Sequence, residues 1–431
     1  MGVLLKILSF RHPLVPLPPM SRINRRDSIN LLSKLTLRRV WNGVKVLASY
    51  HISKWTGKPV QWGYPVSISF EPTTSCNLRC PECPSGLRAF TRPTGMLQKD
   101  FFRETIDQLH KELLYLVFYF QGEPYLNPSF LDMVQYAGSK KIYTATSTNA
   151  HYLTDENAKR TIESGLDRLI ISIDGTTQEV YQQYRVGGQL SKVLEGARNI
   201  VKWKKEMNST KPFVVFQFLV VKPNEHQIDE VKVLAKEIGV DDVWFKTAQI
   251  YDYENDPNQL IPTIDKYSRY RKSGEGYAFK GKLANHCWRL WHDPVITWDG
   301  LVAPCCFDKD AQHRLGEGFG GISLDLDRPL TQLRAVGHEA VLQEPPPLRR
   351  EPGLEAEIQE PRRRLTKVGE PHLSLAGRFR SHKHIDRAAV WVQQGCLEPQ
   401  VTRARRRDVE NDIPADRRDA VTMVDRGHRI S

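Results

Sequence analysis

The sequence has no apolar run long enough to cross a bilayer. Its longest uninterrupted run is the eight-residue segment Leu113–Phe120, whereas a membrane-spanning helix needs about 20 residues. A run this short is typical of a buried strand. The N-terminal apolar stretch does not fit a secretory signal, because Lys6, Arg11 and several prolines interrupt it and no small-residue cleavage site follows. These absences predict a cytoplasmic protein without a transmembrane segment.

The chain also lacks the cysteine pattern of a protein held together by disulfides. It has seven cysteines in 431 residues, and an odd number in a long, apparently cytosolic chain argues against a disulfide framework. Three of them, Cys76, Cys80 and Cys83, lie within eight residues. Such clustering indicates a metal site instead.

The positive charge is not gathered into one patch. The formal net charge is +12, while hydrophobic residues make up 40% and charged residues 26% of the sequence. This composition is ordinary for a globular protein with a sizeable core. The charge by itself is only a weak indication of nucleic acid, an anionic membrane surface or an acidic substrate.

Between residues 61 and 250, short apolar runs alternate with helical patterns. The runs are Val66–Phe70, Tyr115–Phe120, Tyr143–Thr146, Arg168–Ile173, Phe213–Val220 and Asp242–Lys246. Candidate helices lie near residues 99–112, 128–139, 154–164, 190–206 and 226–238. Six strands that alternate with helices predict an α/β fold with a parallel sheet. Periodicity alone leaves open whether that sheet is open or forms a partial barrel.

Residues 1–60 are basic and include a predicted amphipathic helix from about Asp27 to Lys54. Its aliphatic residues recur at steps of mostly three and four, with one shift of two: Ile29, Leu32, Leu35, Leu37, Val40, Val44 and Leu47. The simplest interpretation is a helix that packs on the main domain. Because Arg38, Arg39 and Lys45 are interleaved with the apolar residues, contact with a membrane surface is the alternative.

The last part of the chain differs from the rest in composition. Residues 251–310 are predicted to be a linker followed by a second cysteine group. Residues 1–310 hold 24 Lys and 17 Arg, whereas residues 311–431 hold 2 Lys and 19 Arg and have no tyrosine. This Arg- and Pro-rich tail can bury little surface to offset its ordering entropy. We favour a reading-frame change near Gly316 over a natural basic disordered tail, because the Lys-to-Arg ratio changes abruptly.

The cysteine triplet lies on one short loop, Glu71–Pro84, directly after the first predicted strand. Three thiolates at this spacing can each bind one corner iron of a cubane cluster, since iron–sulfur clusters favour soft cysteine ligands. Three ligands for four irons leave one iron open to a substrate or cofactor. The alternative is a structural zinc site, but zinc prefers four ligands and no fourth Cys or His lies near this loop.

The Cx3Cx2C spacing after the first strand of an α/β unit resembles the radical S-adenosylmethionine (SAM) superfamily, over about Val66–Phe307. The resemblance implies a partial (β/α)6 TIM-type barrel with a [4Fe–4S] cluster whose open iron chelates SAM. It implies that the reduced cluster cleaves SAM to methionine and a 5′-deoxyadenosyl radical, which removes a hydrogen atom from the substrate in a closed barrel. A reductant of the flavodoxin or ferredoxin type is implied as well.

Other residues resemble the family's SAM-binding motifs. The resemblance assigns Gly122, Glu123 and Pro124 to the SAM amino group, Ser147, Thr148 and Asn149 to the ribose and carboxylate, Ser172 and Asp174 to the ribose, and Arg185 to the carboxylate. All follow carboxyl ends of strands, where α/β folds bind ligands. Each motif alone is more often a turn, a helix cap or a surface cation, so their joint order carries the assignment. Glu82 stands where many members have an aromatic residue near adenine.

The second cysteine group surrounds a predicted hairpin. Asp299–Gly300 is a favourable turn between apolar strands and would bring Cys287 near Cys305. This resembles the opening of a SPASM domain, which implies an auxiliary [4Fe–4S] cluster held by Cys287 and Cys305. Only Cys396 follows Cys306, so the ligand set is incomplete, and buried thiols on a hairpin are the alternative.

Two functions follow from these patterns. The first is a radical SAM enzyme that modifies a peptide, a protein or a small molecule, with no nucleic acid as partner. Lys246 and Gln217 are candidate polar groups on its substrate side, although a structural role for both is favoured. The second is a nucleic-acid-binding protein with a structural metal, which would use the +12 charge and the Arg-rich tail.

Overall fold

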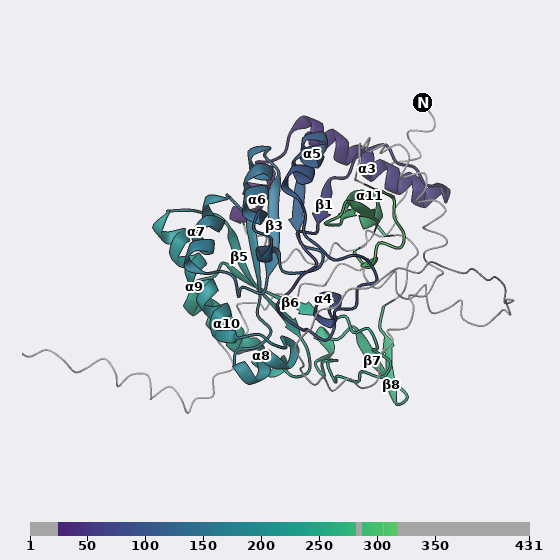
Figure 1. Cartoon of the computed structure of the whole chain (residues 1–431). Coiled ribbons are helices and arrows are strands. Elements are labelled where there is room, and N and C mark those ends of the chain that lie inside the picture. Colours follow the sequence, from purple (N-terminus) through teal and green to yellow (C-terminus); the bar gives the residue numbers. More distant parts are fainter. Residues whose placement is uncertain (1–24, 282–286, 305, 318–431) are drawn as a thin grey trace, which may run out of the picture.

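The computed structural model describes residues 25–281, 287–304 and 306–317 (Figure 1). Its main sheet has the strand order β11-β10-β9-β1-β2-β3-β4-β5-β6. The strands of this sheet are β1 (Ser67–Phe70), β2 (Tyr115–Phe118), β3 (Tyr143–Thr148), β4 (Arg168–Ser172), β5 (Phe213–Val220), β6 (Asp242–Thr247), β9 (Val295–Ile296), β10 (Leu301–Ala303) and β11 (Gly316–Glu317). Strands β1 to β6 pair in parallel, which confirms the six predicted strands and the α/β class.

Helices alternate with these strands and cover one face of the sheet (Figure 1). They are α5 (Lys99–Leu109), α6 (Phe130–Ser139), α7 (Asp155–Glu163), α8 (Gln178–Tyr184), α9 (Leu190–Glu206) and α10 (Ile228–Ile238). The short helix α4 (Pro84–Leu87) lies on the cysteine loop, and the 3-10 helices are η1 (Pro124–Leu126), η2 (Glu225–Gln227) and η3 (Asp265–Tyr267). The five predicted helices are confirmed, and α4 and α8 are additional. The order β1 to β6 with a helical segment after each of the first five is that of the predicted partial (β/α)6 barrel.

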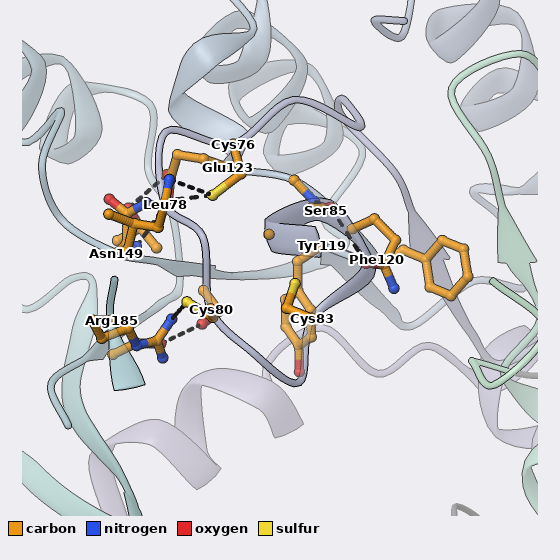
Figure 2. A pocket seen from close by; sticks show the side chains of 16 residues that line it. Cys76, Leu78, Cys80, Cys83, Ser85, Tyr119, Phe120, Glu123, Asn149 and Arg185 are labelled. Atoms are coloured by element: carbon orange, nitrogen blue, oxygen red, sulfur yellow. Dashed lines mark hydrogen bonds between the residues drawn. The ribbon is translucent and has the colours of Figure 1, made fainter. Parts of the chain in front are cut away.

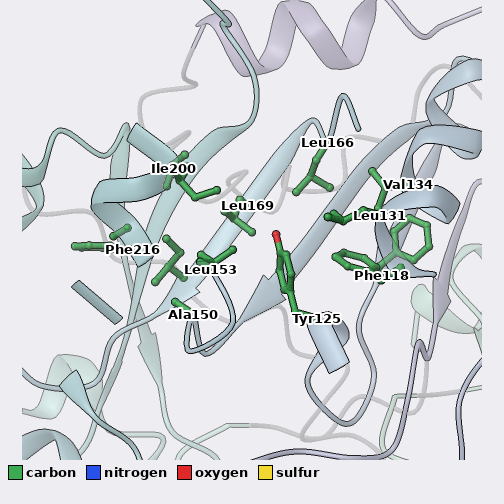
Figure 3. Packing of buried hydrophobic residues seen from close by; sticks show 14 of the residues in the cluster. Phe118, Tyr125, Leu131, Val134, Ala150, Leu153, Leu166, Leu169, Ile200 and Phe216 are labelled. Carbon is green, nitrogen blue, oxygen red and sulfur yellow. The ribbon is translucent and has the colours of Figure 1, made fainter. Parts of the chain in front are cut away.

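The main hydrophobic core lies between the sheet and its helices (Figure 3). Phe118 from β2 and Phe216 from β5 are fully buried there. They pack in one cluster with Leu153, which follows β3, and with Ile200 of α9. Alternate residues of a strand point to opposite faces, so the other face of each strand is left for the barrel interior. That inner face carries polar residues such as Ser147, Ser172 and Arg168.

At the amino end of the strands the barrel interior holds a buried ion pair. Arg168 of β4 pairs with Asp27, lies over the rings of Tyr143 and Trp244, and is therefore surrounded by strands β3 and β6. Asp27 also accepts a hydrogen bond from the Tyr143 hydroxyl. The N-terminal helix α2 (Arg25–Leu32) thus closes this end of the barrel.

The predicted N-terminal helix is two helices, α2 and α3 (Leu37–Thr56). The break coincides with the shift in the apolar stripe, and Thr36 caps α3 by accepting a hydrogen bond from the Arg39 backbone N–H at 3.2 Å. The helices do pack on the main domain, as predicted. However, their apolar stripe does not make that contact, because polar residues such as Arg39 are buried in its place.

The C-terminal hairpin is confirmed. Strand β9 pairs in parallel with β1 and antiparallel with β10, and Gly300 adopts φ +87° in the turn between them. The short helix α11 (Arg289–His292) precedes this hairpin. The hairpin therefore continues the barrel sheet beyond its first strand.

The range predicted as a linker packs under the cysteine loop. It contains the antiparallel pair β7 (Tyr270–Ser273) and β8 (Gly276–Phe279). Leu260 and Tyr270 from this range form a second core cluster with Leu78 and Cys80. Cys305, Cys396 and the tail beyond residue 317 lie outside the described residues, so the frame-change hypothesis stays a prediction.

Candidate functional site

A pocket lies at the carboxyl edge of the strands, beneath the cysteine loop (Figure 2). Its lining comes from the loop and from the ends of β2, β3 and β4: Cys76, Leu78, Cys80, Cys83, Ser85, Gly86, Tyr119, Phe120, Gln121, Gly122, Glu123, Ser147, Thr148, Asn149, Ser172 and Arg185. The structure therefore brings together the three clustered cysteines and all but two of the residues that the sequence assigns to SAM. The two exceptions are Pro124 and Asp174.

Nitrogen donors surround two of the three sulfur atoms. The Leu78 backbone N–H donates to Cys76 Sγ at 3.4 Å, and Asn149 Nδ2 lies 3.8 Å from the same sulfur. Arg185 Nη1 lies 3.7 Å from Cys80 Sγ. Hydrogen bonds to cysteine sulfur are one of the means by which a protein sets the reduction potential of an iron–sulfur cluster. These contacts therefore suit thiolates that bind iron.

Burial makes the free thiols poor acids. It raises the pKa of Cys76 to about 11, and it raises the pKa of Cys80 as well. A metal that binds these sulfurs must therefore displace their protons. Among the residues that the structure describes, no three His, Cys, Asp or Glu side chains meet closely enough to share one ion. Thiols spread along one pocket wall suit a polynuclear cluster, in which each sulfur binds a different iron.

Gly122 is pressed against the cysteine loop. It adopts φ +74°, and a Cβ atom there would lie 2.1 Å from the carbonyl oxygen of Thr73. Its backbone N–H donates to Ser85 Oγ at 2.8 Å, and the Glu123 N–H donates to the Ser75 carbonyl at 2.8 Å. The family resemblance assigned Gly122 to the SAM amino group, where a glycine lets the backbone approach a ligand closely. The structure gives a second reason, which is close approach to the loop that carries the cysteines.

The Glu123 carboxylate joins the ends of β2 and β3. Thr148 Oγ1 donates to Glu123 Oε1 at 2.7 Å, and the Asn149 N–H donates to Oε2 at 2.8 Å. Burial raises the pKa of Glu123 to about 7, although these hydrogen bonds oppose the shift. A cation in the pocket would favour the ionised carboxylate. Glu123 is thus held rigidly and is suited to an ammonium group.

Asp174 lies behind Arg185 rather than in the pocket lining. Arg185 Nε donates to Asp174 Oδ2 at 2.5 Å, and the Leu219 N–H donates to Oδ1 at 2.8 Å. The Asp174 side chain is fully buried. Its observed contacts therefore orient the guanidinium that lines the pocket. Pro124 likewise lies outside the lining, where it begins the 3-10 helix η1.

Six lining residues were not among the predicted site residues: Leu78, Ser85, Gly86, Tyr119, Phe120 and Gln121. Ser85 follows the third cysteine by two positions, and its Oγ accepts the Gly122 N–H. A signal for Tyr119 was available, because period-two alternation from Tyr115 places both on the inner face of β2. Glu82, which replaces the expected aromatic residue, accepts a hydrogen bond from the Tyr251 N–H at 2.8 Å. It therefore fastens the cysteine loop to the segment after β6.

The remaining candidates lie outside this pocket. Lys246 pairs with Leu219 across β5 and β6, and burial, together with Arg289 and Arg269, lowers the pKa of its amine to about 8. Gln217 of β5 does not line the pocket either. Cys287 is buried at 8% exposure, whereas Cys305 lies outside the described residues. The pair Cys287 and Cys305 thus stays a prediction.

These observations define a class before any comparison is made. The chain is an α/β partial barrel whose strand ends carry a thiol-lined ligand pocket. Residues 70–245 match the family model described as the radical SAM superfamily. The matched range contains all three clustered cysteines and the strands from β2 to β5, with the last residue of β1 and most of β6.

Curated relatives agree with this match. The chain is 29% identical over 254 residues to the tungsten-containing aldehyde ferredoxin oxidoreductase cofactor-modifying protein of Pyrococcus furiosus, covering 55% of this chain and 70% of the relative. It is 25% identical over 237 residues to the mycofactocin maturase MftC of Mycobacterium tuberculosis, covering 50% of this chain and 59% of the relative. Among solved structures, Streptococcus suis SuiB bound to S-adenosylmethionine is similar at 14% identity and a TM-score of 0.48, with 65% of this chain and 69% of that chain covered.

The chain therefore contains a radical SAM domain over residues 70–245. It is accordingly an enzyme whose cofactors are a [4Fe–4S] cluster and SAM. This finding favours the first of the two functions inferred from the sequence over the nucleic-acid-binding alternative. Among the described helices, none has the length and apolar content needed to cross a bilayer.

Proposed function

We propose that Cys76, Cys80 and Cys83 hold the [4Fe–4S] cluster and that the neighbouring pocket residues hold SAM. The observation that carries this proposal is the lining of one pocket by three thiols and by side chains from three successive strand ends. When bound, the reduced cluster and SAM together supply the 5′-deoxyadenosyl radical that abstracts hydrogen. The protein's task is to position both groups and to exclude water.

The charged groups of the pocket divide between the two ends of an amino acid. Glu123 accepts hydrogen bonds from β3 and faces the pocket as a carboxylate suited to the SAM ammonium group. Arg185, oriented by Asp174, offers a guanidinium to the SAM carboxylate. The hydroxyls of Ser147 and Ser172, 3.5 Å apart, supply contacts for the ribose. Asp174 thus acts through Arg185, and Pro124 acts by shaping the turn after Glu123.

The substrate is proposed to be a peptide, a protein or a small molecule. Two relatives are a cofactor-modifying protein and a maturase by name, which supports a modification reaction without fixing the substrate. A flavodoxin or ferredoxin type protein is the proposed electron donor. The β9–β10 hairpin fits the opening of a SPASM domain, and an auxiliary cluster at Cys287 and Cys305 remains part of this proposal. A cytoplasmic location is also proposed, because reducing compartments keep thiols such as those of the cysteine loop reduced.

Substitution of single cysteines tests the ligand assignment. We expect Cys76→Ala, Cys80→Ala and Cys83→Ala each to abolish the absorbance of the loop cluster and the reductive cleavage of SAM together, because two remaining thiolates cannot hold the cubane with one open iron. Absorbance and deoxyadenosine formation after anaerobic reconstitution are the two measurements. Cys396→Ala serves as the matched cysteine control and is expected to keep both. Survival of both in any one loop variant would refute the assignment.

A further inference from the structure

Helix α3 exposes its apolar face. Leu37 is 91%, Trp41 64%, Val44 49% and Trp55 85% exposed. These positions are spaced by three, four and eleven residues and so share one face of a helix with 3.6 residues per turn. A surface helix of a globular protein normally turns such a face toward the core. We call these four residues, together with Val40, the outer face of α3.

The opposite face of α3 is mostly polar, with Val46 as its one fully buried apolar residue, and it is hydrogen-bonded to the domain. Arg39 donates to the carbonyl oxygens of Lys141 at 2.5 Å and His110 at 2.7 Å. Asn42 exchanges hydrogen bonds of 3.0 and 2.9 Å with the Tyr64 backbone.

The same pattern continues along the helix. The Trp62 N–H donates to Ser49 Oγ at 2.9 Å, and the Val60 N–H donates to Ser53 Oγ at 2.7 Å. Rotating α3 to bury its apolar residues would leave these backbone groups and Arg39 without partners, which is costly for buried polar groups. The outward direction of the apolar face is therefore fixed by the fold.

The segment around α3 is strongly basic. The first 70 residues contain 11 Lys or Arg and a single acidic residue, Asp27, which is buried in the ion pair with Arg168. Lys45 and Lys54 flank the outer face on its two sides and form no ion pair among the described residues. An apolar face that carries tryptophan and is bordered by lysines is typical of helices that lie on an anionic membrane surface.

We propose that the outer face of α3 binds the surface of an anionic lipid bilayer, with its tryptophans among the acyl chains and its lysines at the lipid head groups. Charge complementarity favours this occupant. Two copies of the same basic face would repel one another, whereas anionic lipid attracts each lysine near the surface. The 20-residue helix is about 30 Å long, so the contact would hold the barrel against the membrane without crossing it. The proposal is independent of the reaction proposed for the pocket.

Binding of the full-length protein to vesicles tests the proposal. We expect sedimentation with vesicles of phosphatidylglycerol and phosphatidylcholine, and little with phosphatidylcholine alone. The double variant Trp41→Ser with Val44→Ser should bind about tenfold or more weakly. Lys45→Gln should weaken binding about fivefold and reduce its salt dependence. Val233→Ser removes an equally exposed apolar residue, 57% exposed on α10, and should leave binding unchanged.

Two controls keep folding and other occupants apart from lipid binding. The Trp41/Val44 variant should retain the wild-type iron content and unfolding midpoint, because both side chains are exposed. Quenching of tryptophan fluorescence by brominated lipid should fall in Trp41→Phe. Equal binding by the Trp41/Val44 variant, absence of binding to anionic vesicles, or a dimer in light scattering that this variant splits would each overturn the proposal.

Discussion

Gly122 carries a backbone contact that no other residue can make. Its positive φ and the 2.1 Å approach of a built Cβ to the Thr73 carbonyl oxygen both exclude a side chain. We expect Gly122→Ala to lower the free energy of unfolding by more than about 2 kcal/mol, since the αL conformation alone costs about 1–2 kcal/mol. Urea unfolding of the metal-free protein measures this.

Gly165 provides the matched control for that substitution. It has φ +72°, but nothing lies within 4 Å of a built Cβ. Gly165→Ala should therefore lower the free energy of unfolding only by the cost of the αL conformation. Iron content should fall in Gly122→Ala and stay normal in Gly165→Ala, because only Gly122 touches the cysteine loop. Equal effects of the two substitutions would show that the contact with Thr73 does not matter.

Lys246 makes stability depend on pH. Burial, Arg289 and Arg269 lower the pKa of its amine from 10.5 to about 8. Between these two values the unfolded chain binds a proton that the folded protein lacks, so the free energy of unfolding should rise with pH across this window. Below about pH 8 both states are protonated and the destabilisation is complete.

The difference between wild type and Lys246→Met isolates this effect. At pH 7 the variant should be more stable, by at most about 3 kcal/mol for a shift of this size. The two proteins should converge as the pH approaches 10.5. Denaturant unfolding from pH 7 to 10 gives both curves, and parallel curves would contradict the pKa shift.

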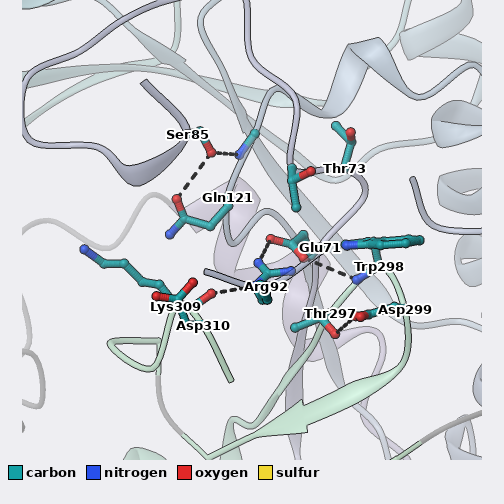
Figure 4. A network of polar contacts seen from close by, with 12 residues as sticks. Glu71, Thr73, Ser85, Arg92, Gln121, Thr297, Trp298, Asp299, Lys309 and Asp310 are labelled. Atoms are coloured by element: carbon teal, nitrogen blue, oxygen red, sulfur yellow. Dashed lines mark hydrogen bonds and ion pairs between the residues drawn. The ribbon is translucent and has the colours of Figure 1, made fainter. Parts of the chain in front are cut away.

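At the scale of elements, one buried ion pair connects the cysteine loop with the C-terminal hairpin (Figure 4). Arg92 Nη2 and Glu71 Oε1 are 2.5 Å apart, and both side chains are buried. Arg92 Nε donates to the Lys309 carbonyl at 2.6 Å, and Glu71 Oε2 accepts the Trp298 N–H at 3.3 Å. Strand β1, the loop after it and the β9–β10 hairpin are thus held by two side chains.

Removing one partner of this pair should strongly lower the free energy of unfolding. We expect Arg92→Met to destabilise the protein by about 3–5 kcal/mol, because it leaves the Glu71 carboxylate buried without its counterion. The double variant with Glu71→Gln should recover part of that loss. Lys99→Met breaks the half-exposed pair with Asp132 and should cost at most about 1 kcal/mol. Urea unfolding compares the three, and similar losses for Arg92→Met and Lys99→Met would refute the role of burial.

Local sequence patterns predicted the helices and strands well. They failed where tertiary contacts decide which face of an element is buried. Alternating apolar runs located all six parallel strands, and the Asp299–Gly300 turn located the β9–β10 hairpin. The apolar stripe of α3 did not identify the buried face of that helix. Hydrogen bonds from Arg39 and Asn42 to the backbone of distant residues decide which face is buried. No local pattern indicates such partners.

The sequence predicted only part of the candidate site, again because local patterns do not show tertiary contacts. Side chains at the carboxyl ends of parallel strands meet at one edge, so Cys76, Glu123 and Asn149 could be expected together. The place of Asp174 behind Arg185 could not, because both residues follow the same strand and only their side-chain packing distinguishes lining from support. The hydrogen bond from Arg185 to Asp174 indicates that Asp174 orients the Arg185 guanidinium.

At the scale of the whole molecule, the two ends of the barrel have different tasks. The amino end is closed by α2 through the pair of Asp27 with Arg168. The carboxyl end carries the thiol-lined pocket, whereas α3 lies at the amino end beside α11, where Arg39 binds the Lys141 carbonyl just before β3 (Figure 1). Chemistry is thus confined to one end of a barrel whose other end is closed.

The central claim is that this barrel loads a cubane on three thiolates and uses it to cleave SAM. The most direct test is anaerobic reconstitution of the full-length protein, reduction with dithionite, and measurement of bound iron and deoxyadenosine in the same sample. We predict about four irons per chain at the loop cysteines, or more where an auxiliary cluster forms, and deoxyadenosine that appears only when both SAM and reductant are present. Protein that remains folded yet shows no iron–sulfur absorbance and forms no deoxyadenosine would contradict the account.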